Sequence, residues 1–132
     1  MFRIEIMLHA RQARPAWRVL LLVLVAGVCW LAFTPNPTLP SIGGNDKLDH
    51  LVAFASLGLV AMLSLGAGLR QCAGVAVGLL GFGIFIELVQ IGIPGRSADW
   101  RDVVADMAGM LAGIAAVSLL RRLWPLPTTP PS

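Results

Sequence analysis

Four long apolar stretches constrain this chain more than any other feature of its sequence. They cover residues 17–33, 48–69, 71–93 and 103–120, and each is close to the roughly 20 residues that a helix needs to cross a bilayer. Of the 132 residues, 57% are hydrophobic and only 13% are charged, which is more apolar surface than a soluble domain of this size can bury. The sequence therefore predicts an all-α membrane protein, a bundle of four transmembrane helices.

The first apolar stretch follows several arginines, as it would in a signal peptide. Residues 26–29 resemble a lipoprotein cleavage box, but Val28 stands where a small residue should precede Cys29, and no small-x-small site follows. We therefore expect an uncleaved anchor. Cys29 and Cys72 fall at opposite ends of their helices, so a disulfide between them is not expected.

Basic residues are distributed unevenly about these spans. With four crossings, one side holds Arg3, Arg11, Arg14, Arg18, Arg70, Arg121 and Arg122, and the other holds Lys47, Arg96 and Arg101. The positive-inside rule then puts both termini in the cytoplasm. The net charge of +3 reflects these topology signals, so we expect no nucleic-acid partner.

This orientation divides the chain into three parts. Residues 1–16 form a basic cytoplasmic segment, residues 17–120 the transmembrane domain, and residues 121–132 a proline-rich cytoplasmic tail. The loops at 34–45 and 94–101 are then external.

Small residues predict how the helices associate. Gly74 and Gly78 are spaced as a GxxxG pair in the third helix, and Gly109 and Gly113 form another in the fourth. Such faces let helices approach closely in lipid, within one chain or between copies in a homo-oligomer. Because Glu87 lies on a face nearly opposite Gly74 and Gly78, we expect the third helix to be central, with contacts on two sides.

Three ionisable residues share one depth on the outer side. At 1.5 Å per residue, His50, Glu87 and Asp106 lie roughly 6, 9 and 6 Å below the outer ends of their helices. A charge alone in hydrocarbon costs several kcal/mol, so we expect these three to converge on an outward-facing pocket as candidate acid/base residues. Candidate binding residues around them are Asp46, Lys47, Gln90, Arg96, Ser97, Asp99 and Asp102.

The polar residues also form an ordered series of short motifs. These are Asp46-Lys47-x-x-His50-x-x-x-Phe54, Glu87-x-x-Gln90, Pro94-Gly95-Arg96-Ser97-x-Asp99-x-x-Asp102 and Gly109-x-x-x-Gly113. Over residues 46–120 the series resembles the VanZ-like family of small bacterial membrane proteins. That family usually has asparagine where this chain has Asp106, so the resemblance implies neither charge nor protonation state there.

The resemblance implies a multi-pass protein of the bacterial cytoplasmic membrane. The founding member is linked to low-level resistance to the glycopeptide teicoplanin without an established biochemical activity. By extension, a link to the cell envelope or to glycopeptide resistance is an expectation for this chain.

Several functions fit this outer polar layer. It can bind an anionic membrane lipid or a lipid-linked cell-wall intermediate, with Lys47 and Arg96 on phosphate. It can catalyse acid–base chemistry on a lipid-linked substrate, with Glu87 or Asp106 working with His50. It can also be a purely structural ion-pair network, or a proton relay of a transporter.

A metal site is a further alternative for the same layer. His50, Glu87 and Asp106 would supply one imidazole and two carboxylates to a divalent cation. His50 is the only histidine on the outer side, because His9 precedes the first span. We therefore expect no metal and no cofactor.

Overall fold

The computed structural model describes residues 11–35 and 45–125, and these residues form helices joined by short connections. A turn of 3-10 helix, η1 (Arg11–Ala13), leads into α2 (Arg14–Phe33), followed by α3 (Asp46–Leu65), α4 (Leu69–Gln90) and α5 (Trp100–Leu123). All four α-helices are long and apolar enough to cross a membrane. The predicted all-α fold with four spans is confirmed, and the chain is a multi-pass membrane protein.

All four helices begin two or three residues earlier than the apolar stretches predict. The side chain of Asn45 accepts a hydrogen bond from the backbone N–H of Lys47 at 3.1 Å, and Asp99 accepts one from Arg101 at 2.9 Å. These N-caps start α3 and α5 at polar residues that hydropathy leaves out. At its other end α3 stops before Gly66, whose φ of 108° lies in the region that favours glycine.

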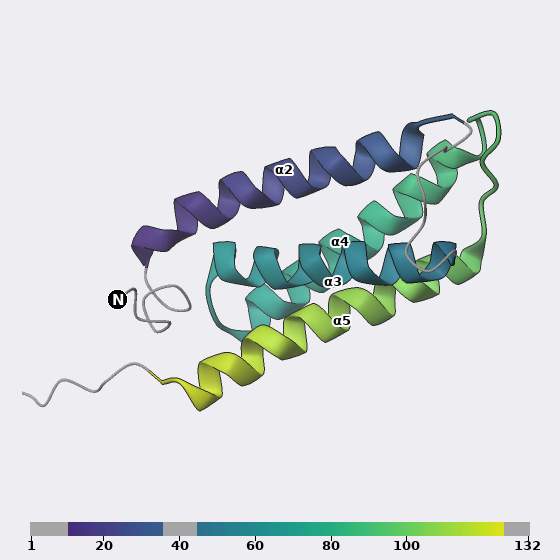
Figure 1. Ribbon diagram of the computed structural model, residues 1–132. Helices are drawn as coiled ribbons and strands as arrows, with labels where there is room; N and C mark the ends of the chain where they lie inside the picture. Colours follow the sequence, from purple (N-terminus) through teal and green to yellow (C-terminus); the bar gives the residue numbers. More distant parts are fainter. Residues whose placement is uncertain (1–10, 36–44, 126–132) are drawn as a thin grey trace, which may run out of the picture.

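The helices run alternately up and down, so one end of the bundle collects the start of α2, the end of α3, the start of α4 and the end of α5 (Figure 1). This end carries the basic residues Arg14, Arg18, Arg70, Arg121 and Arg122. The opposite end collects the starts of α3 and α5 and the end of α4. The acidic residues of these helices gather there.

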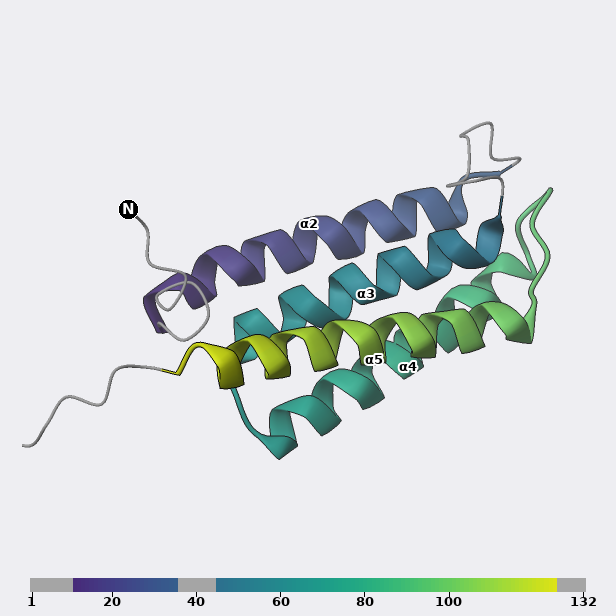
Figure 2. The same cartoon turned by 60° about the horizontal axis from the view of Figure 1, so that its bottom comes forward.

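The central helix is α3, not α4 as the sequence predicts. Figure 2 shows α3 lying between α2 and α5, and α3 also packs against α4. The α3–α5 contact is the closest, because Gly109 and Gly113 bring α5 against the backbone of α3 at Leu51 and Ala55. The predicted glycine face of α5 therefore packs within the chain.

The glycine face of α4, unlike that of α5, packs against no other described helix. A Cβ added at Gly74, Gly78 or Gly81 would have no neighbour within 4 Å among the described residues. This face is exposed, and α4 reaches the bundle mainly through the side that carries Gly83 and Glu87. The expectation of a central α4 is wrong because only one of its two faces is covered.

The first ten positions of the predicted basic cytoplasmic segment, residues 1–16, lie outside the described residues. The external loop at 34–45 is described only at residues 34, 35 and 45. The proline-rich tail is described as far as residue 125.

Candidate functional site

The candidate site lies at the acidic end of the bundle, where α3, α4 and α5 meet. Buried polar residues here are Glu87, Gln90, Asp102 and Asp106, although each comes from a helix of high hydropathy. Half-buried Lys47, His50 and Asp99 complete the layer. These residues form a polar layer in an otherwise apolar bundle.

His50 and Asp106 are in direct contact at the centre of this layer. His50 Nδ1 lies 2.9 Å from Asp106 Oδ1, and the exposed fractions of the two side chains are 13% and 2%. The second oxygen of Asp106 is directed at α4, because a Cβ added at Gly83 would stand 2.7 Å from Oδ2. Gly83 thus leaves the space into which the Asp106 carboxylate fits.

Glu87 also joins two elements. Its Oε2 accepts a hydrogen bond from the backbone N–H of Asp99 at 2.8 Å, which ties α4 to the segment that starts α5. Its Oε1, like Oδ2 of Asp106, is buried without a hydrogen-bond partner among residues 11–35 and 45–125. Each of these two carboxylates therefore has one buried oxygen that accepts no hydrogen bond from the described residues.

Lys47 neutralises part of this acidity. Its Nζ lies 3.1 Å from Asp99 Oδ2 and 3.1 Å from Asp102 Oδ1, while 43% of its own side-chain surface stays exposed. The backbone N–H of Arg101, followed by the ammonium of Lys47, holds the pKa of Asp99 below its usual value. Carboxyl groups still outnumber basic groups in the layer.

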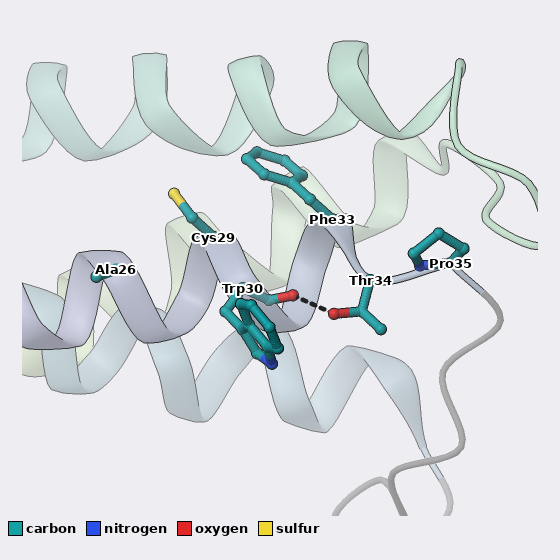
Figure 3. A pocket seen from close by; sticks show the side chains of 6 residues that line it. All are labelled: Ala26, Cys29, Trp30, Phe33, Thr34 and Pro35. Carbon is teal, nitrogen blue, oxygen red and sulfur yellow. Dashed lines mark hydrogen bonds between the residues drawn. The ribbon is translucent and has the colours of Figure 1, made fainter.

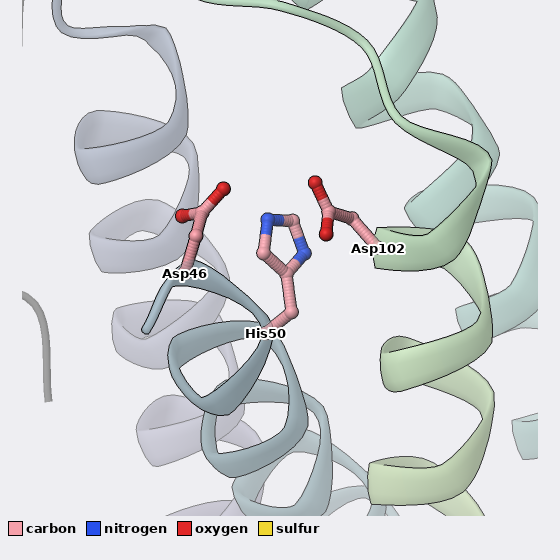
Figure 4. A group of neighbouring side chains, drawn as sticks. All are labelled: Asp46, His50 and Asp102. Carbon is pink, nitrogen blue, oxygen red and sulfur yellow. The ribbon is translucent and has the colours of Figure 1, made fainter. Parts of the chain in front are cut away.

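Asp46, His50 and Asp102 form a second grouping at the mouth of the site. One ligand atom from each lies within 4.8 Å of the other two. Figure 4 shows the imidazole ring standing between the two carboxylates, Asp46 and His50 from α3 and Asp102 from α5. Asp46 is exposed and Asp102 is buried, so the grouping runs from the surface into the bundle.

Two predicted binding residues contact α2 instead of the carboxylates. Arg96 donates hydrogen bonds to the backbone oxygens of Leu31 and Thr34, and Gln90 donates to Ala32 O at 3.2 Å. The last carbonyls of a helix lack intrahelical partners and carry its negative dipole end, so a guanidinium is attracted to them. Arg96 is a candidate ligand for phosphate in the sequence, and in this structure its guanidinium contacts the carbonyls at the end of α2.

At the opposite end of the bundle, Arg121 likewise donates hydrogen bonds to the last carbonyls of another helix. It donates to Gly66 O at 2.7 Å and to Met62 O at 2.9 Å, at the end of α3. Two arginines therefore each cap the last turn of another helix. Backbone carbonyls at membrane depth require such partners.

Two other candidate site residues lie at or just before the start of α5. Ser97 is exposed in the loop before α5, and Asp99 rather than Ser97 caps that helix. Asp102 was expected at the rim but is 3% exposed. Its position one turn before Asp106 on the same helical face is the sequence signal for that burial.

The hollow in Figure 3 is a different feature. It lies along the last turns of α2 and is lined by Ala26, Cys29, Trp30, Phe33, Thr34 and Pro35. The lining is mostly apolar and shares no residue with the carboxylate layer. It has the character of a surface that lipid acyl chains contact.

The comparisons with known proteins bear on the whole bundle. A sequence model of the VanZ/LLP1 family matches residues 8–121, which include α2, α3, α4, all but the last two residues of α5, and the polar layer. The chain belongs to the VanZ/LLP1 family. Neither the curated proteins nor the solved structures contain a match to it.

Proposed function

We propose that this VanZ/LLP1 protein binds the phosphate-bearing headgroup of an envelope lipid at the acidic end of its bundle, on the outer side of the bacterial cytoplasmic membrane. The observation that carries the proposal is the burial of Glu87, Asp102 and Asp106 in helices that are otherwise apolar. Ionisable residues are costly to keep within apolar membrane helices, and such residues commonly mark ligand sites.

The distribution of arginines supports the outward orientation. Arg14, Arg18, Arg70, Arg121 and Arg122 lie at the end of the bundle opposite the acidic layer. Cytoplasmic ends of membrane helices are enriched in such residues. The acidic layer then faces outward, at the depth of lipid headgroups.

Two basic side chains suit a lipid phosphate at this end. Lys47 is partly exposed and an ammonium has three N–H donors, two of which its carboxylate contacts occupy. Arg101 is exposed, with its guanidinium 5.9 Å from the centroid of the Trp100 ring. Trp100 suits the membrane interface, so Arg101 is held at headgroup level.

Native mass spectrometry of protein extracted in a mild maltoside detergent tests the proposal. We expect wild-type protein to retain a lipid and Lys47→Gln to retain at least about tenfold less, as for loss of a charge-assisted contact of about 1.4 kcal/mol or more. Arg122→Gln, an exposed arginine at the opposite end, is the matched control and should retain lipid like wild type. Equal retention by both variants would contradict headgroup binding at Lys47.

A specific observation also favours a second function, acid–base catalysis on a lipid-linked substrate. Asp106 beside Nδ1 of His50 favours the tautomer with the proton on Nδ1, which leaves Nε2 as a proton acceptor. That is the arrangement of a general base. Purified protein in liposomes that changes the mass of an added lipid-linked substrate, with the change lost in His50→Gln, would replace binding by catalysis.

A further inference from the structure

The grouping of Asp46, His50 and Asp102 goes beyond headgroup binding. Their ligand atoms lie within 4.8 Å of one another, which suits a shared ion. We propose that Asp46, His50 and Asp102 bind a divalent cation, Mn²⁺ or Zn²⁺, with Asp106 orienting the histidine. These ligands differ from the set that the sequence suggested, because Glu87 and Asp106 make their contacts deeper in the bundle.

Asp106 contacts the ring nitrogen of His50 that does not face the proposed cation. It contacts Nδ1 of His50 at 2.9 Å, and a metal-bound histidine typically donates its other ring N–H to such a carboxylate. Asp106 is 1% exposed, so its carboxylate is enclosed by the surrounding helices. Nε2 of His50 is then the nitrogen that faces a cation.

Lys47 holds Asp102, the second proposed ligand, in position. Its ammonium contacts Oδ1 of Asp102 at 3.1 Å, and a carboxylate has a second oxygen to offer. Asp46 lies one turn before His50 on the same face of α3, so both reach the cation from one helix. Asp102 reaches it from α5.

The buried acidity of the layer points to a cation independently of the ligand spacing. Oδ2 of Asp106 and Oε1 of Glu87 are buried without partners among the described residues. Carboxyl groups outnumber Lys47 and His50, and uncompensated negative charge at membrane depth is costly. A divalent cation bound by Asp46, His50 and Asp102 would lower the net negative charge of the layer; it is not a direct partner of Oδ2 of Asp106, which packs against Gly83.

The ligand chemistry narrows the identity of the ion. Mg²⁺ and Ca²⁺ prefer oxygen ligands alone, whereas an imidazole combined with carboxylates suits Mn²⁺ or Zn²⁺. Three protein ligands leave coordination positions open for water or another oxygen ligand. A lipid phosphate is such a ligand, so a cation here would let an acidic site accept an anionic headgroup.

The test uses full-length protein in maltoside detergent with no added lipid, titrated with Mn²⁺ and followed by electron paramagnetic resonance. We expect one saturable Mn²⁺ site per chain from which Zn²⁺ displaces the ion. His50→Gln and Asp46→Asn should each weaken Mn²⁺ binding at least tenfold, and Asp106→Asn by about 10–100-fold through the orientation of His50. Asp49→Asn, on the same helical turn but outside the group, should bind as wild type does.

Asp46→Asn keeps the test informative if His50→Gln does not fold, because Asp46 is exposed and its replacement leaves the core unchanged. Absence of saturable binding in wild type, or equal binding in wild type and Asp46→Asn, would overturn the proposal. No lipid is added in the Mn²⁺ titration, so its result does not depend on lipid binding. If the protein binds Mn²⁺ but retains no lipid in native mass spectrometry, headgroup binding is rejected and the cation site stands.

Discussion

His50 and Asp106 stand 56 positions apart in the sequence, yet their side chains meet at 2.9 Å in the middle of the acidic layer. The contact depends on a third residue, because Oδ2 of Asp106 occupies the space beside Gly83 on α4. One carboxylate therefore touches α3 and α4 while belonging to α5. This contact orients the His50 imidazole, on which the acid–base function and the proposed cation site depend.

Gly83→Ala should disturb that contact. The added Cβ would stand 2.7 Å from Oδ2 of Asp106, and the carboxylate is held on its other side by His50. We expect a loss of about 1–3 kcal/mol in stability from overpacking. Thermal unfolding in detergent measures the loss, and the ¹⁵N shifts of the His50 ring report whether the contact with Asp106 survives.

Gly81→Ala is the matched control on the same helix. A Cβ at Gly81 has no neighbour within 4 Å among the described residues, so only the helix propensity changes. Stability should stay the same or rise by about 0.5–1 kcal/mol. Similar losses in the two variants would show that Asp106 is not seated against Gly83.

Gly109→Ala should weaken the α3–α5 interface. The new Cβ meets backbone atoms of Leu51 and Ala55, which cannot turn aside as a side chain can, so the two helices must separate. Gly78→Ala, on the exposed face of α4, should be tolerated. Unfolding in sodium dodecyl sulfate, followed by circular dichroism, should show a lower midpoint for Gly109→Ala alone.

The ion pair of Asp99 and Lys47 predicts a dependence on pH. Because the pKa of Asp99 is lowered in the folded state, its ionised form stabilises the fold above the usual aspartate pKa of about 4. That contribution is lost as the pH falls through the lowered pKa. Asp99→Asn keeps an N-cap side chain but not the charge, so its melting temperature should fall less than that of wild type between pH 6 and pH 3. Parallel curves would show that the Asp99 charge does not stabilise the fold.

The proposed orientation predicts which end of the bundle is accessible from outside. In a variant without Cys29 and Cys72, a cysteine replacing Ser97 should react with a membrane-impermeant maleimide in intact spheroplasts. A cysteine replacing Arg122 should react only after lysis. The reverse pattern would place the acidic layer in the cytoplasm.

The four spans and the convergence of His50 with Asp106 follow from simple sequence patterns. Long apolar stretches need a membrane, and a charge within such a stretch needs a partner, so depth and helical face bring His50 and Asp106 to one layer. The Gly109/Gly113 contact with α3 follows from spacing in the same way.

Tertiary contacts that satisfy backbone groups were harder to predict. The sequence marks Arg96 as a cation near carboxylates, but it does not tell how close the unpaired carbonyls at the end of α2 lie. The exposed face of α4 was missed for a related reason. A GxxxG pattern predicts close approach but does not name the partner, and Gly74 and Gly78 meet none among the described residues.

Glu87 gives the most direct test of whether the acidic layer binds a ligand or only joins helices. Glutamine keeps the hydrogen bond that Oε2 of Glu87 accepts from Asp99 at 2.8 Å, but it removes the charge. Leucine removes both and leaves the Asp99 N–H without its acceptor, at a cost of about 1–3 kcal/mol. Glu87→Leu should therefore unfold at a lower temperature than wild type.

The decisive measurement is the amount of lipid that Glu87→Gln retains per folded chain in native mass spectrometry, compared with wild type at equal expression. We predict a folded, membrane-inserted variant that retains at least about tenfold less lipid, because the buried negative charge of Glu87 helps to hold the proposed cation that accepts the lipid phosphate; tenfold corresponds to about 1.4 kcal/mol of lost interaction. Retention equal to that of wild type would show that the buried charge of Glu87 is not needed for binding, and would leave the layer as a network that only holds α4 and α5 together.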